Sequence, residues 1–253
     1  MQIIHNLQNW QTLRRTFAPN QSLGFVPTMG NLHVGHQSLF EICSKENDLS
    51  VVIIFINPTQ FNNADDFKLY PKTLEADLNL LRKTGVDYCL LPDTQALYPE
   101  GYRFRIEETQ TSLHLEGLHR PGHFNGVLTV VMMLLQLVKA NRSYFGEKDY
   151  QQYQLIRDMT KAFFLDTEII PCPTIRDTSG LAFSSRNNRL TPPERALADK
   201  FAEIFHQNQS CDTIKTALTN LGIKVDYVED KEQRRFAAVY IGDVRLIDNY
   251  PIV

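Results

Sequence analysis

The sequence has no excess of positive charge. Its 253 residues include 26 Lys and Arg against 29 Asp and Glu, a net charge of −3 at pH 7. Proteins that mainly bind the nucleic-acid backbone rely on many cationic contacts to phosphate. We therefore expect no nucleic-acid partner.

Long apolar runs and paired cysteines are also missing. The longest apolar stretch, residues 127–138, contains Thr129 and Gln136 and falls short of the roughly 18–20 residues that cross a bilayer. The first five residues, Met-Gln-Ile-Ile-His, lack the basic and apolar regions of a signal peptide. The four cysteines are too far apart for a CxxC metal or redox motif. We expect a cytoplasmic protein with no membrane partner.

Glycine is scarce, at 12 residues, but Gly24, Gly30 and Gly35 fall close together. The sequence contains neither GxGxxG nor GxxxxGK[ST], which excludes the two common glycine-rich phosphate loops. Backbone freedom is thus concentrated in one segment that matches neither loop.

Apolar runs alternate with amphipathic stretches over the first 170 residues. We predict strands or extended segments over residues 22–27, 51–56, 86–91, 102–107, 142–145 and 168–170, helices over 33–45, 72–84, 127–140 and 149–161, and a long loop over 57–71. This alternation is typical of βαβ units. The predicted fold class is therefore α/β, with a doubly wound parallel sheet.

The composition changes near residue 175, after two prolines. We predict helices over residues 192–207 and 212–220 and strands over 224–228 and 236–241. The expected organisation is a sheet domain over residues 1–175 and a smaller C-terminal α+β domain over 176–253.

The segment PTMGNLHVGH, residues 27–36, lies between the first predicted strand and helix. Ligands of open parallel sheets bind at such junctions, and a helix N-terminus favours phosphate. Gly30 permits a sharp turn. His33 and His36 are three residues apart, so we expect them on one helix face, where both could donate to phosphate. The alternatives are a solvated helix start or a zinc pair, although no third ligand is suggested nearby.

Two later segments suit the same ligand. Residues 146–149, Gly-Glu-Lys-Asp, occupy another strand-to-helix junction, where Lys148 offers a mobile point charge for a triphosphate. Residues 183–186, Phe-Ser-Ser-Arg, follow the predicted sheet; hydroxyls and a guanidinium suit phosphate oxygens, and such a loop could close over a substrate. The alternatives are an ordinary capping turn and a solvated loop.

Two amide side chains suit a small molecule that carries hydroxyl and carboxylate groups. Gln60 follows the second predicted strand, and Gln152 lies one turn into the helix after Lys148. The alternative is that both are surface amides.

Seven motifs together resemble the pantoate–β-alanine ligase (pantothenate synthetase) family, whose members belong to the HxGH nucleotidyltransferase-like superfamily. In order along the chain, they are VPTMGNLHVGH, FINPTQF, YPKT, RPGHFNGV, FGEKDYQQ, GLAFSSRN and GDVRLIDN. The resemblance implies a Rossmann-like fold and a homodimer. It also implies that ATP, accompanied by Mg²⁺, activates pantoate as pantoyl adenylate with release of pyrophosphate. β-Alanine then yields pantothenate and AMP.

The resemblance also implies roles for individual residues. It places ATP binding on Met29, Gly30, Asn31, Leu32, His33, Val34, Gly35, His36, Gly146, Glu147, Lys148, Asp149, Ile175, Phe183, Ser184, Ser185 and Arg186. It places catalysis on His36, His33, Lys148, Ser184, Ser185 and Arg186, and pantoate or β-alanine binding on Pro27, Gln60 and Gln152. The metal ligands stay unassigned, with Asp77 as a candidate contact to Mg²⁺ or to the residues that surround it. The sequence departs from the usual pattern at Thr59, where the family commonly has Met, and at Phe183, where it has Met or Leu.

Three rival functions share part of this pattern. Another adenylyltransferase would carry HxGH but has no reason to carry NPTQF and YQQ. A non-catalytic nucleotide-binding module would bind ATP without turnover. A fragment of a tRNA synthetase would need a basic surface, against which the net charge argues.

Overall fold

The computed structural model describes residues 1–62 and 64–252. The chain forms two compact units. The first comprises residues 1–32, 36–146 and 151–172, and the second comprises 33–35, 147–150 and 173–253. Within the described residues, no helix has the length and apolar character needed to cross a membrane.

The first unit is built on a six-stranded sheet with the order β1-β4-β3-β2-β5-β6. Its strands are β1 (Gln2–Ile4), β2 (Leu23–Thr28), β3 (Leu49–Ile54), β4 (Tyr88–Leu90), β5 (Arg142–Gly146) and β6 (Glu168–Cys172). Every pairing is parallel. The predicted α/β class with a doubly wound sheet is confirmed. The strand order reverses between β2 and β5, and such switch points are where open α/β sheets bind ligands.

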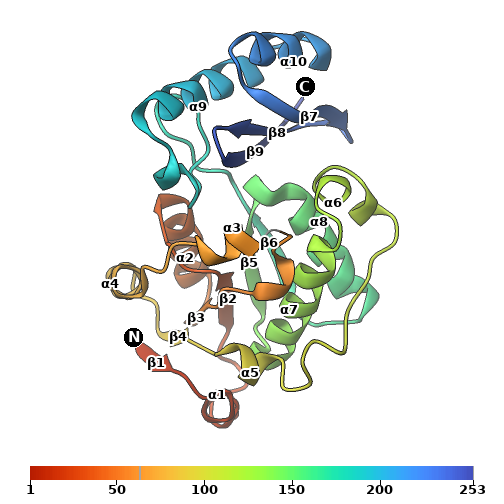
Figure 1. The fold of residues 1–253 in the computed structure, drawn as a ribbon. Coiled ribbons are helices and arrows are strands. Elements are labelled where there is room, and N and C mark those ends of the chain that lie inside the picture. Colours follow the sequence, from red (N-terminus) through yellow and green to blue (C-terminus); the bar gives the residue numbers. More distant parts are fainter. Residues whose placement is uncertain (63, 253) are drawn as a thin grey trace. The chain divides into compact units, whose positions relative to one another are not determined.

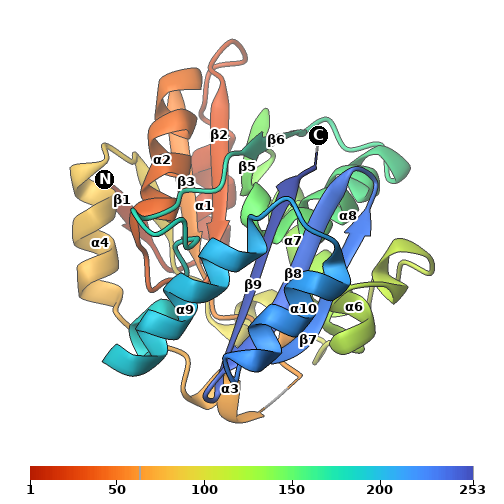
Figure 2. The same ribbon diagram turned by 90° about the horizontal axis from the view of Figure 1, so that it is seen from above.

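Helices cover both faces of this sheet (Figures 1 and 2). The longer ones are α1 (Leu7–Arg14), α2 (Val34–Glu46), α4 (Leu74–Lys83), α7 (His123–Val138) and α8 (Tyr150–Ala162). Figure 1 shows α2 and α4 on one side of the sheet and α7 and α8 on the other. Phe40 of α2 and Leu81 of α4 share one buried cluster with Val26 and Val52 of the sheet. The strands are apolar on both faces because both faces are covered.

Several parts of the first unit differ from prediction, and α7 begins at His123, four residues before the predicted start at residue 127. The strand β1 and the helix α1 were not predicted; β1 has only three residues, too few for a visible pattern. The predicted loop 57–71 contains the 3-10 turn η1 (Pro58–Gln60) and α3 (Ala64–Lys68). The predicted extended segment 102–107 forms no strand, because the Ile106 N–H donates to the Thr129 hydroxyl of α7 instead of a neighbouring strand. Short elements α5 (Thr94–Leu97), η2 (Thr111–Leu113) and α6 (Glu116–His119) complete the unit.

The second unit contains a three-stranded antiparallel sheet of β7 (Lys224–Lys231), β8 (Arg234–Ile241) and β9 (Val244–Pro251). Helices α9 (Pro192–Phe205) and α10 (Cys211–Asn220) pack on it through a core that includes Phe201, Phe205, Leu218 and Val239. The predicted helices and two strands are present. The third strand, β9, was not predicted, because charged and amide side chains interrupt its apolar pattern.

Candidate active site

The turn after β2 requires glycine at its tightest point. Gly30 has φ +77° and Asn31 has φ +50°. A Cβ at Gly30 would lie 3.0 Å from the Asp77 Oδ2 atom and 3.1 Å from Ile54. Backbone with positive φ disfavours other residues, so this turn depends on Gly30 both for its conformation and for space.

The carboxylate of Asp77, in α4, fixes the backbone of the same turn. Its carboxylate accepts the N–H of Asn31 at 3.0 Å and the N–H of Leu32 at 2.8 Å. The Thr73 hydroxyl donates to both of its oxygens at 3.1 Å. Asp77 is only 2% exposed, and a buried carboxylate needs such donors. The sequence argument named Asp77 only as a candidate contact to Mg²⁺ or its surroundings, and the structure shows that its carboxylate binds the backbone of this turn.

His33 directly precedes α2 rather than lying within it, so the prediction that the helix begins at His33 was one residue early. The physical reason is capping: the His33 Nδ1 atom accepts the N–H of Gly35 at 3.1 Å. This is the bond that an N-cap side chain makes to the second helical residue. His33 and His36 therefore do not both occupy the helix, and they fall in different compact units.

The charge state of His33 follows from its surroundings. Burial, reinforced by the positive charge of Lys148, lowers its pKa to about 4 despite the opposing effect of Asp149. The ring is neutral at pH 7. Because Nδ1 accepts a hydrogen bond, the proton of the neutral ring sits on Nε2. At pH 7, His33 can therefore donate a hydrogen bond through Nε2–H without carrying a charge.

Phe183 packs against this histidine. The two rings are stacked, with centroids 6.4 Å apart and planes inclined by 26°. The Phe183 N–H donates to the Ile175 carbonyl at 3.0 Å, and Arg176 and Ala182 form an isolated antiparallel β-bridge. The segment between Ile175 and Phe183 is therefore a narrow hairpin. An aromatic residue at position 183 fits here because it covers the histidine ring.

The predicted Ser-Ser-Arg loop continues from this hairpin. The Arg186 N–H donates to the Ser184 hydroxyl at 3.2 Å, and the Asn187 N–H donates to the Ser184 carbonyl at 3.0 Å. Ser184, Ser185 and Arg186 are each half-buried. A turn leading into η4 (Asn187–Arg189) thus presents the two hydroxyls and the guanidinium consecutively.

Lys148 lies in the 3-10 turn η3 (Glu147–Asp149), between β5 and α8. The Asn249 Nδ2 atom donates to the carbonyls of Glu147 and Lys148 at 2.9 and 2.8 Å. Apart from Gly146 and its two neighbours in the chain, no atom of the described residues lies within 4 Å of where a Cβ on Gly146 would stand. The protein itself leaves the space beside Gly146 open.

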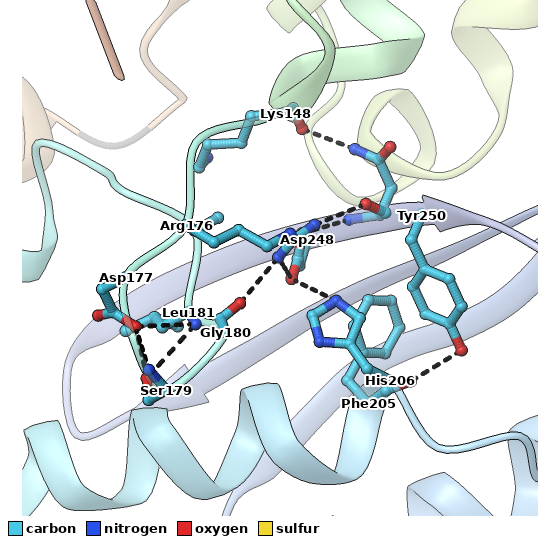
Figure 3. A network of polar contacts seen from close by, with 12 residues as sticks. Lys148, Arg176, Asp177, Ser179, Gly180, Leu181, Phe205, His206, Asp248 and Tyr250 are labelled. Carbon is cyan, nitrogen blue, oxygen red and sulfur yellow. Dashed lines mark hydrogen bonds and ion pairs between the residues drawn. The ribbon is translucent and has the colours of Figure 1, made fainter. Parts of the chain in front are cut away.

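A polar network surrounds the hairpin (Figure 3). Arg176 binds the Asp248 carboxylate with both terminal nitrogens, at 2.6 and 2.8 Å, and also donates to the Gly180 carbonyl at 3.0 Å. The His206 Nε2 atom lies 3.4 Å from Asp248. Burial would raise the pKa of Asp248, but hydrogen bonds and charges from His206 and Arg176 lower it overall. The carboxylate is therefore ionised, and it fixes the hairpin by a bidentate contact.

The structure brings Met29 and Gln60 together. The Gln60 Nε2 atom lies 3.3 Å from the Met29 sulfur, and its Oε1 atom accepts from Asn57 Nδ2 at 3.0 Å. Asn57 is 1% exposed, and its Oδ1 atom accepts from the Tyr98 hydroxyl at 2.8 Å and from the Thr59 hydroxyl at 3.0 Å. Threonine at position 59 therefore has a polar partner that methionine could not use.

The backbone of Gln60 is held by α7 and by Arg120, which lies just before that helix. His123 Nδ1 lies 2.8 Å from the Gln60 carbonyl, and Arg120 donates to the same oxygen at 3.4 Å. A Cβ on Gly126 would lie only 2.4 Å from the Thr59 carbonyl oxygen. Glycine at this position lets α7 approach η1 closely. These residues belong to the RPGHFNGV motif, to which the sequence argument gave no role.

Gln152, in α8, is half-exposed, and so is Pro27, in β2. The adjacent Gln151 is 5% exposed and binds three backbone groups, those of Thr111, His114 and Glu116. The two neighbouring glutamines thus have different environments: Gln151 holds the segment before α7, and Gln152 remains accessible.

The described residues contain no group of three or more His, Cys, Asp and Glu side chains that could hold a metal ion. Magnesium often keeps several waters and binds through substrate phosphates with only one or two carboxylates. Within the described part of the chain, the protein forms no dedicated cage of such ligands.

These features define a class of protein. The sheet is doubly wound, and its switch point lies between β2 and β5. A glycine turn and the HxGH motif follow β2, and the turn that carries Lys148 follows β5. This combination is typical of ATP-binding, nucleotidyltransferase-like α/β enzymes. Residues 2–251 match the family described as pantoate-beta-alanine ligase. The chain belongs to this family, and its activity is the ATP-dependent condensation of pantoate with β-alanine.

Individual relatives support the assignment along the whole chain. Pantothenate synthetase of Legionella pneumophila (strain Corby) is 59% identical over 250 residues, covering 99% of both chains. That of Coxiella burnetii (strain Dugway 5J108-111) is 55% identical over 249 residues, covering 98% of this chain and 96% of the relative. The crystal structure of the Francisella tularensis ligase, complexed with beta-gamma ATP and β-alanine, has a TM-score of 0.96 at 44% identity, covering 99% of this chain and 97% of the other.

Proposed function

We propose that the chain joins pantoate to β-alanine in two steps through pantoyl adenylate. In the first step, a carboxylate oxygen of pantoate attacks the α-phosphorus of ATP, and the bond to the bridging oxygen breaks to release pyrophosphate. In the second step, the amine of β-alanine attacks the acyl carbon, AMP leaves and the amine loses a proton. No side chain needs to act as nucleophile, so the protein's contribution is orientation and charge stabilisation.

One observation carries this proposal. Three motif segments far apart in the sequence, residues 33–35, 147–150 and 183–186, belong to the same compact unit. There the charge of Lys148 acts on His33, and Phe183 covers the His33 ring. Segments that gather in this way are expected to serve one ligand, and their donors suit a triphosphate.

The donors have distinct roles in the proposal. His33 offers Nε2–H without adding charge, and Lys148 offers a full positive charge to the phosphates. Ser184, Ser185 and Arg186 add hydroxyl and guanidinium donors, and His36 donates at the start of α2. Together they stabilise the charge that builds on phosphate oxygens in the first step.

The remaining assigned residues bind rather than activate. The turn from Met29 to Leu32 and the segments 34–35 and 146–149 approach ATP through their backbone, while Ile175 and Phe183 take the adenine side. Gln60, Gln152 and Pro27 take pantoate or β-alanine. The fixed backbone of Gln60 and the exposure of Gln152 support this division.

We further propose that Mg²⁺ enters bound to ATP and neutralises phosphate charge, that the enzyme acts as a homodimer, and that it works in the cytoplasm. For the cytoplasm, the support is that the cysteines form no disulfide. Burial raises the pKa of Cys43 and Cys89 to about 12, as expected of inert structural thiols. The dimer rests on the family resemblance, and sedimentation equilibrium of the purified chain tests it.

Isotope exchange between ATP and pyrophosphate tests the two-step route. We expect exchange only when pantoate is present, and production of pantothenate and AMP after β-alanine is added. Exchange without pantoate, or exchange that needs a phosphopantetheine or a nicotinamide nucleotide instead, would refute the route. ATP binding without any turnover would instead indicate a non-catalytic module.

Alanine variants test the donors in the same assay. His36→Ala and Lys148→Ala should each lower kcat by about 10²–10³, the range for loss of one transition-state donor. Lys161→Ala is the matched control and should leave kcat unchanged, because Lys161 is an exposed lysine in the last turn of α8, the helix that follows the Lys148 turn. A kcat near that of the wild type in His36→Ala or Lys148→Ala would contradict the role of that residue.

A further inference from the structure

Asn249 of β9 is 3% exposed and uses its whole side-chain amide within the second unit. Its Nδ2 atom donates to the carbonyls of Glu147 and Lys148 at 2.9 and 2.8 Å. Its Oδ1 atom accepts from Arg234 Nη1 at 2.5 Å. The chemistry fixes this orientation, because a rotated amide would set oxygen against two carbonyls and NH₂ against a guanidinium.

Arg234 reinforces the same turn from β8. Its Nη2 atom lies 3.3 Å from the Glu147 carboxylate, and its guanidinium carbon lies 3.8 Å from the centre of the Tyr150 ring. The turn that carries Lys148 is therefore held at its backbone, at the side chain before Lys148 and at the start of α8. Lysine has a long, flexible stem, so a fixed backbone narrows the region its ammonium group can reach.

The neighbouring residue, Asp248, holds the other donor segment. It binds Arg176 with both oxygens, and Arg176 also donates to the Asn249 carbonyl at 3.1 Å. Arg176 lies in the hairpin that leads directly to Ser184. Two adjacent residues of one strand thus hold the two segments that we assign to the phosphates.

We propose that Asp248 and Asn249 are positioning residues: a two-residue anchor on β9 that sets the Lys148 turn and the Ser184–Arg186 loop for ATP. The proposal rests on the ATP roles assigned above to those two segments. Asn249 acts through Lys148, and Asp248 acts through Arg176. Neither needs to touch the nucleotide.

A double-mutant cycle tests the link between Asn249 and Lys148. Asn249→Asp keeps the shape and the acceptor for Arg234 but turns an oxygen toward two carbonyls. We expect it to weaken ATP binding about 10-fold or more. Residues that act through one another give non-additive effects, so in a Lys148→Ala background the same change should weaken binding by less than about 2-fold.

Calorimetric titration with ATP gives the dissociation constants for this cycle and requires no turnover. Asn249→Ser, which keeps one donor, should give an intermediate loss, and it replaces Asn249→Asp in the cycle if that variant does not fold. The matched control is Asp226→Asn on β7, which removes an ion pair with Arg245 of β9 at 2.9 Å and leaves the side chains of Asp248 and Asn249 in place. It should bind ATP as the wild type does.

The results distinguish failure of the anchor from failure of the two-step route. The anchor would be refuted if Asn249→Asp weakened ATP binding as much in the Lys148→Ala background as it does in the wild type. It would also be refuted if folded Asn249→Asp or Asn249→Ser bound ATP with wild-type affinity. If instead the cycle is non-additive but the wild type shows no pantoate-dependent exchange, the anchor stands and the two-step route fails. For Asp248, the same cycle pairs Asp248→Asn with Arg186→Ala, and we again expect non-additive losses.

Discussion

Asp77 offers the sharpest test of how the turn after β2 is built. In Asp77→Ala, the buried N–H of Asn31 and the half-buried N–H of Leu32 lose their acceptor. An unsatisfied buried donor costs about 1–3 kcal/mol, so we expect a loss of this size from Asn31 and a smaller loss from Leu32, whose N–H is partly solvated. The Thr73 hydroxyl can rotate, so we add no further free-energy cost for its lost hydrogen bond. Since stabilities are commonly about 5–15 kcal/mol, the variant should fold but be clearly destabilised.

The same change should lower activity beyond its effect on folding. The turn carries Gly30 and leads into HxGH, and misplacing a binding segment by about 1 Å can cost about 10²-fold. We expect kcat/KM for ATP to fall about 10- to 100-fold in protein that is fully folded. Urea unfolding and ATP-dependent product formation, measured on one preparation, separate the two effects. Asp77→Asn, which retains one acceptor oxygen, should lose less of both.

Asp87 supplies the matched control. Its carboxylate accepts the N–H and hydroxyl of Ser50 at 2.8 and 2.9 Å, at the beginning of β3, whereas ligands bind where strands end. Asp87→Ala should lower the free energy of unfolding and leave kcat/KM within about 2-fold of the wild type, as expected away from a reacting centre. The reasoning fails if folded Asp77→Ala keeps wild-type kcat/KM, or if its stability falls by less than about 1 kcal/mol.

Two further predictions follow. The pKa of His33, about 4, lies below the ordinary value, so its neutral form stabilises the fold fully above about pH 6.5, and that stability is lost as pH falls toward 4. Because His33 does not change charge between about pH 5 and 8, His33→Asn, which keeps a capping oxygen, should leave the shape of the pH profile of kcat/KM unchanged over this range. If the wild type shows a loss of kcat/KM toward acidic pH that the variant lacks, His33 does titrate there and the prediction is wrong. Gly126→Ala should raise the KM for pantoate and destabilise the protein by about 1–3 kcal/mol in urea unfolding, because its Cβ would meet the Thr59 carbonyl; an exposed helix position would instead gain about 1 kcal/mol, so stabilisation would contradict the close approach.

The sheet and most helices could be predicted because their signals are local. Continuous apolar runs such as residues 51–54 mark strands that are covered on both faces, and amphipathic spacing marks α4. The strand β9 escaped prediction for a local reason as well. Asp248 and Asn249 look like surface residues in the sequence, yet each is 3% exposed, because its partners lie elsewhere in the chain.

The partners of the site residues were not predictable in the same way. Asn31 is 46 residues from Asp77, and Lys148 is 101 residues from Asn249. The motifs gave the residues that can donate to phosphate, but no periodicity specifies which distant carboxylate or amide binds the backbone beneath them. Gln151 and Gln152 show the limit: they are adjacent and chemically identical, and only the fold makes one buried and the other accessible.

A division of labour follows from these contacts. The groups assigned to ATP include a lysine and an arginine, whose long side chains are individually flexible. The groups that hold their segments, Asp77, Asp248 and Asn249, are short and at most 3% exposed, and Asp77 and Asn249 bind backbone directly. Short side chains lose little rotamer freedom when they are fixed, so they can define a backbone accurately. We therefore expect residues that need not touch ATP to set the position of the donors assigned to it, and substitutions at those residues should impair ATP use while every donor stays in place.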